Sequence, residues 1–196
     1  METIAQKLER VLQDRVELVA YDPRWPAWFE AEKQRLLALF PALVRRVEHF
    51  GSTAIPGLAA KPVVDLLIEV VSLDAARKHI APVLERAGYD HFWRATHGDD
   101  GPPFYAWFIK RDERGARTHH LHMVEAGSEH WDRLLFRDYL IARPDCARRY
   151  EELKRRLAAE HSADRVAYTR AKSAFIEEIT AAAKAARHCP HPPSPA

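Results

Sequence analysis

Residues 63–71 read VVDLLIEVV, the most apolar run in the sequence. A short and nearly continuous run of Val, Leu and Ile is typical of a strand that lies inside a sheet and is covered on both faces. Asp65 interrupts this run with a charge. An ionised carboxylate that is buried alone costs several kcal/mol, so Asp65 needs a partner, which can be a cation, a metal ion or hydrogen-bond donors.

A second feature precedes this strand. Residues 44–50 predict a strand that ends in Gly51-Ser52, and residues 53–64 separate this pair from Asp65. A Gly-Ser pair at a strand end exposes backbone N–H groups and a hydroxyl, which suits a phosphate. A carboxylate on the adjoining strand can hold a divalent cation that bridges to that phosphate. The alternative is an ordinary turn beside a buried, paired acid.

Hydrophobic periodicity and turn residues predict the remaining elements. Helices are expected over 3–14, 26–40, 73–87, 129–142, 144–160 and 164–187, and further strands over 16–21, 89–94, 104–111 and 117–125. The polar stretch 96–103 predicts a loop. This order predicts an α/β (α+β) fold with a mixed sheet flanked by helices over 16–127, a helical C-terminal subdomain over 128–187, and a disordered tail over 188–196.

Composition excludes several classes of protein. The 196 residues are 47% hydrophobic and 30% charged, which allows a packed core, and the formal net charge of +2 argues against a dedicated nucleic-acid binder. No apolar run approaches the ~20 residues that span a bilayer, and the N-terminal stretch lacks the apolar core of a signal peptide. Cys146 and Cys189 form no C-x-x-C motif. A reducing, cytoplasmic location without membrane contact is therefore expected.

Three histidines fall within residues 118–122, THHLH. On a strand, His120 and His122 project to one face and His119 to the other. Two imidazoles together with Asp65 would make a three-ligand metal site with an open position, which suits zinc or manganese better than magnesium. The alternative is that these histidines form hydrogen bonds with their neighbours or bind a phosphate as cations.

Several cations are candidates to bind an anion. Lys61 lies in the loop before the apolar strand. Lys172 falls on an otherwise apolar helical stripe that includes Tyr168, so its amine either extends to the surface or points into a pocket. Arg117 flanks the predicted hairpin turn at Arg114-Gly115, where cations are more often exposed to solvent.

Five motifs resemble the GrpB family in order along residues 16–187. They are YDPRWPAWFEAE, VEHFGSTAIPGLAAKPVVDLLIEV, THHLHMVE, LLFRDYL and YTRAKSAFI, which begin at residues 21, 47, 118, 134 and 168. The family consists of small bacterial proteins with a nucleotidyltransferase-like fold. Related domains are also fused behind dephospho-CoA kinase, but this chain has no P-loop.

The resemblance implies a site but also reveals a departure from its pattern. The nucleotidyltransferase superfamily combines a Gly-Ser turn with an acid-x-acid pair on the next strand and a third acid elsewhere. Gly51, Ser52 and Asp65 match, but Leu67 stands in the place of the second acid. Glu69 shares a face with Asp65 but lies about 13 Å further along the strand, too far to bind the same metal.

By this resemblance, the protein binds a nucleoside triphosphate with a divalent metal (Mg, Mn or Zn) and transfers a nucleotidyl group to a small-molecule hydroxyl. The implied residues are Asp65 and Ser52 for catalysis, Asp65, His120 and His122 for the metal, and Gly51, Ser52, Thr53, Lys61, Arg117, Tyr168 and Lys172 for the nucleotide. Leu67 favours the alternative, a non-catalytic ligand-binding or folding-accessory module. A weaker third hypothesis is a metal-dependent hydrolase or phosphotransferase that uses the histidines.

Overall fold

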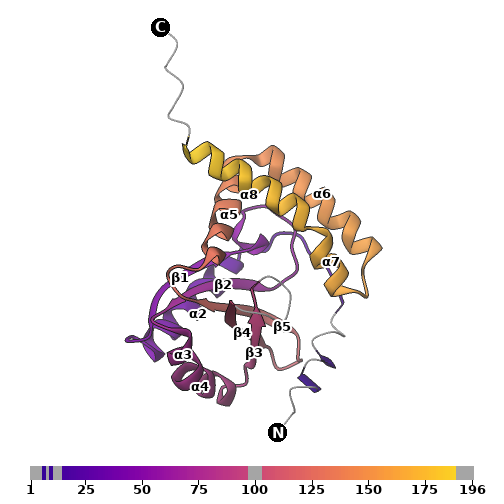
Figure 1. Ribbon diagram of the computed structural model, residues 1–196. Helices are drawn as coiled ribbons and strands as arrows, with labels where there is room; N and C mark the ends of the chain where they lie inside the picture. The colour runs from indigo at the N-terminus through magenta and orange to yellow at the C-terminus, as the bar shows by residue number, and fades with distance from the viewer. Residues whose placement is uncertain (1–5, 8, 11–14, 97–102, 189–196) are drawn as a thin grey trace.

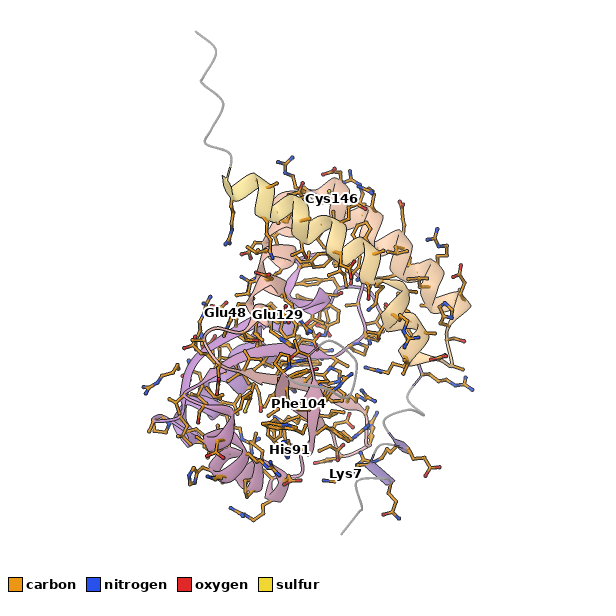
Figure 2. The ribbon with its side chains drawn as sticks, viewed as in Figure 1. Lys7, Glu48, His91, Phe104, Glu129 and Cys146 are labelled. Carbon is orange, nitrogen blue, oxygen red and sulfur yellow. The ribbon has the colours of Figure 1, made fainter. Side chains whose placement is uncertain are left out.

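The computed structural model describes residues 6–7, 9–10, 15–96 and 103–188. The predicted helix over 3–14 and the predicted loop over 96–103 therefore lie largely outside the described residues, and the tail after residue 188 lies entirely outside them. Cys146 is a buried free thiol in the helical part of the protein, away from His91 and Phe104 of the sheet (Figure 2). Cys189 is outside the described residues.

A five-stranded sheet forms the centre of the fold (Figure 1). Its strands are β1 (Val44–Phe50), β2 (Val64–Val70), β3 (Asp90–Ala95), β4 (Phe104–Arg111) and β5 (Arg117–Val124). They lie in the order β1-β2-β5-β4-β3, in which β2 and β5 are parallel and the other pairs are antiparallel. The predicted mixed α/β sheet is thus confirmed.

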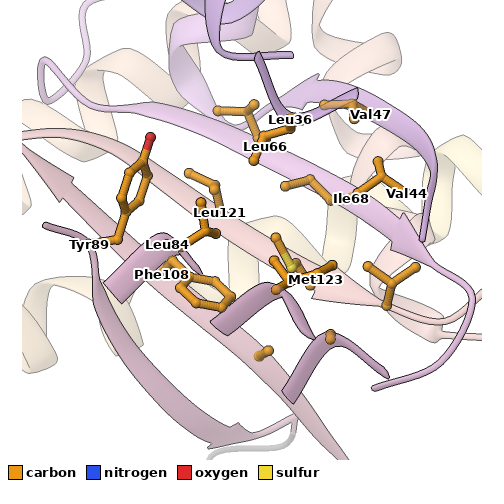
Figure 3. Close-up of a cluster of buried hydrophobic side chains, with 14 of the residues drawn as sticks. Leu36, Val44, Val47, Leu66, Ile68, Leu84, Tyr89, Phe108, Leu121 and Met123 are labelled. Carbon is orange, nitrogen blue, oxygen red and sulfur yellow. The ribbon is translucent and has the colours of Figure 1, made fainter. Parts of the chain in front are cut away.

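One face of the sheet packs against N-terminal helices. These are α2 (Trp25–Leu39) and a helical segment made of α3 (Leu73–Ala75), a π-helical turn (Ala76–Ile80) and α4 (Ala81–Arg86). Figure 3 shows Leu66, Ile68, Leu121 and Met123 of the central strands meeting Leu84 of α4. The central position predicted for the VVDLLIEVV strand is confirmed, because side chains on both of its faces are buried.

The C-terminal helices gather on the opposite side of the sheet (Figure 1). They are α5 (Asp132–Ala142), α6 (Pro144–Glu160), α7 (Arg165–Ala171) and α8 (Ser173–His188). This confirms the predicted helical C-terminal region, although the helix predicted over 164–187 is interrupted at Lys172. Whether the helical part is a subdomain of its own stays a prediction.

Side-chain-to-backbone hydrogen bonds attach these helices to the sheet. Arg137 of α5 donates to the carbonyl oxygen of His49 at 2.6 Å. On α6, Glu151 accepts from the N–H of Ala59 at 3.0 Å, and Lys154 donates to the carbonyl oxygen of the same residue. Both backbone groups of Ala59 are therefore satisfied by one helix, which fixes the loop between β1 and β2.

The prediction of a strand over 16–21 is wrong. Only Val19 pairs, in a single antiparallel bridge to Ala60. The N–H of Val16 instead donates to the carbonyl oxygen of Ser162, so this segment runs between the sheet and the helices and has no strand partner along its length.

No helix within the described ranges is both long enough and apolar enough to cross a membrane.

A buried ionic network joins α2 to the sheet. Glu32 is 3% exposed, accepts from Lys110 Nζ of β4 at 2.5 Å and also accepts from the hydroxyl of Tyr89. Burial alone would raise the pKa of Glu32, but the hydrogen bonds from Lys110 and Tyr89 outweigh burial and hold it below its usual value. The carboxylate therefore stabilises the fold above the pKa of the unfolded chain, and this stabilisation is lost as the pH falls.

We predict that Lys110→Met lowers the free energy of unfolding by about 3 kcal/mol at pH 7, because it leaves a buried carboxylate without its cation. Lys78→Met is the control, since Lys78 pairs with Asp74 on an exposed helix surface and should cost well under ~1 kcal/mol. Urea denaturation at pH 7 and pH 4 measures both. An effect of Lys110→Met that does not shrink at the lower pH would contradict the role of the Glu32 charge.

Candidate functional site

The turn after β1 lies directly against Asp65. Phe50, the last residue of β1, pairs with Asp65 of β2, and Gly51 follows with a φ of 74°. A Cβ atom on Gly51 would lie 2.5 Å from Asp65 Oδ2. Glycine is therefore required here for two reasons. The backbone adopts a conformation that is rare for L-residues, and the turn approaches the carboxylate too closely for a Cβ atom.

Asp65 pairs with His120 in the parallel register of β2 and β5. Asp65 Oδ1 lies 3.0 Å from His120 Nδ1 and 3.9 Å from His122 Nε2. Arg117 Nη1 lies 3.4 Å from His120 Nε2, and because arginine can only donate, Nε2 accepts and Nδ1 carries the proton that it donates to Asp65. The imidazole of His120 is thus a neutral link between Arg117 and Asp65.

The charge states follow from burial and hydrogen bonding. Burial lowers the pKa of His120 to about 4 in spite of the neighbouring carboxylate, so the ring is neutral at neutral pH. Burial would raise the pKa of Asp65, but the hydrogen bond from His120 and the positive charges nearby outweigh it and keep the pKa below its usual value. Asp65, with 25% of its side chain exposed, is therefore an ionised carboxylate.

A cavity of about 430 Å³ opens beside Asp65, between the sheet and the C-terminal helices. All the predicted site residues line it except two, Arg117 and His122. Arg117 is buried behind His120, and His122 is buried with its Nε2 3.9 Å from Asp65 Oδ1. His119 points to the other face, as predicted, where its ring experiences the charge of Glu32 on α2.

Two lysine amines face this cavity around one aromatic ring. Lys172 Nζ lies 4.2 Å and Lys61 Nζ 5.3 Å from the ring centroid of the buried Tyr168. Burial lowers the pKa of Lys172 to about 8 and that of Lys61 well below its usual value. Among the described residues, no carboxylate lies within ion-pair distance of either amine. Of the two alternatives for Lys172, the structure shows the pocket orientation.

Sequence reasoning missed several lining residues on the helices, among them Arg133, Tyr150 and Lys154. The buried phenol of Tyr150 lines the cavity together with Ser52. Lys154 is 1% exposed, lies 4.9 Å from the Tyr150 ring centroid, and burial lowers its pKa to about 7. The signal for Lys154 was present, because it interrupts an apolar helical stripe in the same way as Lys172; Arg133 has no such signal.

Leu67, which stands where the superfamily pattern has its second acid, is part of the hydrophobic core. Leu67 is fully buried in a cluster with Phe50, Trp107 and Leu134. Glu69 does not line the cavity, whereas Asp132 and Glu177 reach it from the helices, and Asp132 is paired with Lys184 at 2.5 Å. Asp65 is thus the one carboxylate that the sheet contributes to the lining.

The donor set beside Asp65 fits a divalent metal ion. Asp65, His120 and His122 each offer one ligand atom, and these atoms lie within 4.8 Å of one another. Burial lowers the pKa of His122 well below its usual value, so its ring is in the neutral form that binds metals. One carboxylate and two neutral imidazoles suit Zn²⁺ or Mn²⁺, although His120 would have to exchange its hydrogen bond to Asp65 for the ion.

We predict that Gly51→Ala destabilises the fold by more than the ~1 kcal/mol that a left-handed conformation costs an L-residue, because it also displaces Asp65. Gly57→Ala is the matched control, since Gly57 has a φ of 77° but no atom within 4 Å of an added Cβ. Urea denaturation measures by how much the loss of unfolding free energy in Gly51→Ala exceeds that in Gly57→Ala. That excess should largely disappear in an Asp65→Ala background, and equal costs for the two glycines would contradict the close approach.

Comparison with known proteins shows the family to which the chain is similar. A family model described as "GrpB protein" matches residues 15–182. The chain is 38% identical over 170 residues to the glutamate-rich protein GrpB of Alkalihalophilus pseudofirmus, a match that covers 86% of this chain and 96% of the relative. It is 37% identical over 171 residues to the UPF0157 protein YqkA of Bacillus subtilis, where the match covers 87% of this chain but spans about half the relative's length, 48%.

A solved structure and a larger enzyme also match. The crystal structure of the conserved protein GrpB from Enterococcus faecalis has a TM-score of 0.75 and 32% sequence identity, and the match covers 87% of this chain and 99% of that one. A dephospho-CoA kinase of Mycolicibacterium paratuberculosis is 31% identical over 182 residues, which are 83% of this chain and 44% of the enzyme. On the family match and these relatives, the chain belongs to the GrpB family.

Proposed function

We propose that the cavity binds the phosphate groups of a nucleoside triphosphate together with a divalent metal ion, and that the protein transfers a nucleotidyl group to a hydroxyl of a small molecule. One observation carries this proposal. A single carboxylate, Asp65, lies against the Gly51-Ser52 turn and shares a cavity with two lysines that have no carboxylate partner among the described residues.

Each group has a physical task in this function. Lys61 and Lys172 would attract the charge of the phosphates, because a desolvated ammonium group without an ion-pair partner among the described residues is stabilised by an incoming anion. Asp65, His120 and His122 would hold the metal, whose contribution is to neutralise phosphate charge. Ser52 and Tyr150 add two hydroxyl groups to the cavity lining. Catalysis would consist mainly of positioning and electrostatic stabilisation.

A second function is a non-catalytic module that binds a ligand or assists folding. The observation that favours it is Leu67, which stands in the place of the second acid and is fully buried in an apolar cluster. The similarity to part of a dephospho-CoA kinase also supports it, because in that protein a related segment belongs to a longer chain. In this alternative the cavity binds its anion without turnover.

We predict that ATP with Mg²⁺, Mn²⁺ or Zn²⁺ raises the free energy of unfolding, by ~2.7 kcal/mol at a hundredfold excess over Kd. The other nucleoside triphosphates are tested in parallel by thermal denaturation. Asp65→Asn should remove the metal-dependent part of the stabilisation. Asp74→Asn changes an exposed acid far from the cavity lining and should leave it intact.

The outcomes separate the two functions. Stabilisation accompanied by pyrophosphate release in the presence of a hydroxyl acceptor supports the transferase. Stabilisation without pyrophosphate release for any acceptor supports the binding module. The absence of stabilisation with every nucleotide and metal contradicts nucleotide binding.

We predict that purified protein incubated with Zn²⁺ or Mn²⁺ and dialysed retains metal, and that Asp65→Ala or His122→Ala abolishes the retention. His79→Ala, which removes an exposed histidine on another part of the fold, is the control. Elemental analysis gives the metal content directly, without an activity assay. Unchanged metal content in both site variants would exclude this ligand set.

A further inference from the structure

Lys61 is held in place more firmly than a loop lysine usually is. The preceding residue, Ala60, exchanges both backbone hydrogen bonds with Val19, at 2.9 and 3.0 Å. The carbonyl oxygen of Lys61 itself accepts from the N–H of Val63 at 2.7 Å. The side chain therefore leaves a fixed backbone and extends along the ring of Tyr168 into the cavity.

The surroundings of this amine are mainly cationic. Lys172 lies over the same ring, at the junction of α7 and α8. Arg165 on α7 and Arg117 on β5 add positive charge, and Asp65 on β2 is the carboxylate that opposes it. Two further groups from α6, Tyr150 and Lys154, line the cavity as well. A second ammonium in this space would be repelled by its neighbours and poorly hydrated.

We propose that Lys61 is a nucleophilic amine that condenses with the carbonyl group of a small anionic aldehyde or ketone, while Lys172 binds the anionic group of that compound. The cavity then has an activity that does not depend on nucleotide transfer. Its two amines have different tasks because only one of them needs to be protonated.

The electrostatics agree with this division. Burial lowers the pKa of Lys61 well below its usual value, and Arg165 and Lys172 lower it further, while Asp65 opposes them. The pKa of Lys172 is lowered less, to about 8, so this side chain is mostly a cation at neutral pH. An ordinary lysine has only ~0.04% free amine at pH 7, because its pKa is about 10.4. Desolvation beside another cation is an established way to make a lysine nucleophilic.

The condensation balances without a co-reactant. The lone pair of Lys61 Nζ attacks the carbonyl carbon, and a proton passes from nitrogen to the former carbonyl oxygen to give a carbinolamine. Loss of one water molecule forms the C=N double bond of an imine. No oxidant or reductant is consumed.

The test uses pyridoxal 5′-phosphate, an aldehyde that carries a phosphate, on the full chain at pH 7. Imines are fixed by borohydride after short times, and the modified lysines are identified by peptide mass spectrometry. We expect labelling at Lys61 at least tenfold faster than at the exposed Lys78. Labelling that is no faster at Lys61 than at Lys78, or that falls on Lys172, would overturn the proposal.

The pH dependence gives a signature that needs no variant. The free amine of an ordinary lysine rises about tenfold for each pH unit below a pKa of about 10.4. Because the pKa of Lys61 is well below its usual value, the ratio of labelling at Lys61 to labelling at exposed lysines should fall as the pH rises from 7 to 9. A constant ratio would mean that Lys61 titrates as an ordinary lysine and would refute the assignment.

Variants then separate the two roles. Lys61→Arg replaces the amine with a permanently charged, non-nucleophilic group and should abolish the fast label, whereas Lys78→Arg should not change it. Lys172→Met should slow labelling at Lys61, because the phosphate loses its cation and Lys61 loses a neighbouring charge. Undiminished labelling at Lys61 in Lys172→Met would contradict the anchoring role.

Adding ATP with a metal ion distinguishes this activity from nucleotide binding. If both occur in one cavity, ATP protects Lys61 from the label. Fast labelling that ATP does not affect supports the nucleophile and counts against the nucleotide site. Stabilisation by ATP without fast labelling supports the nucleotide site alone.

Discussion

The carboxylate of Asp65 is the constraint on which the site depends. It lies on an interior strand with three quarters of its side chain buried, where a charge without a partner would be unfavourable. Its neighbours meet this requirement from three directions. Gly51 leaves space for the carboxylate, His120 donates a hydrogen bond, and Lys172 across the cavity supplies opposite charge.

The C-terminal helices complete this arrangement. Without α6 the backbone groups of Ala59 would lose their partners. The same helices enclose Lys61 and Lys172 in a space with little water, where charges interact more strongly than at a surface. The packing of the C-terminal helices on the sheet therefore has two effects. It fixes the loop between β1 and β2, and it lowers the pKa values of the amines opposite Asp65.

Several features could be predicted from local pattern. The interior strand, the mixed sheet and the helical C-terminal region follow from hydrophobic periodicity, which records how each segment is buried. The predicted strand over 16–21 fails because alternation does not reveal whether a partner strand exists. Tyr150 and Arg133 were missed because helical residues far along the chain reach the cavity only through the packing of whole helices.

The sequence by itself determined that an acid interrupts the most apolar strand, that a Gly-Ser turn precedes it and that Leu67 replaces a second acid. These are properties of residue type and order. Only the tertiary structure decided that Lys61 and Lys172 share one ring, that Arg117 lies behind His120 and that no described carboxylate pairs with the two amines. Charge and reactivity depend on distance and solvent access, and these arise only when separate elements pack together.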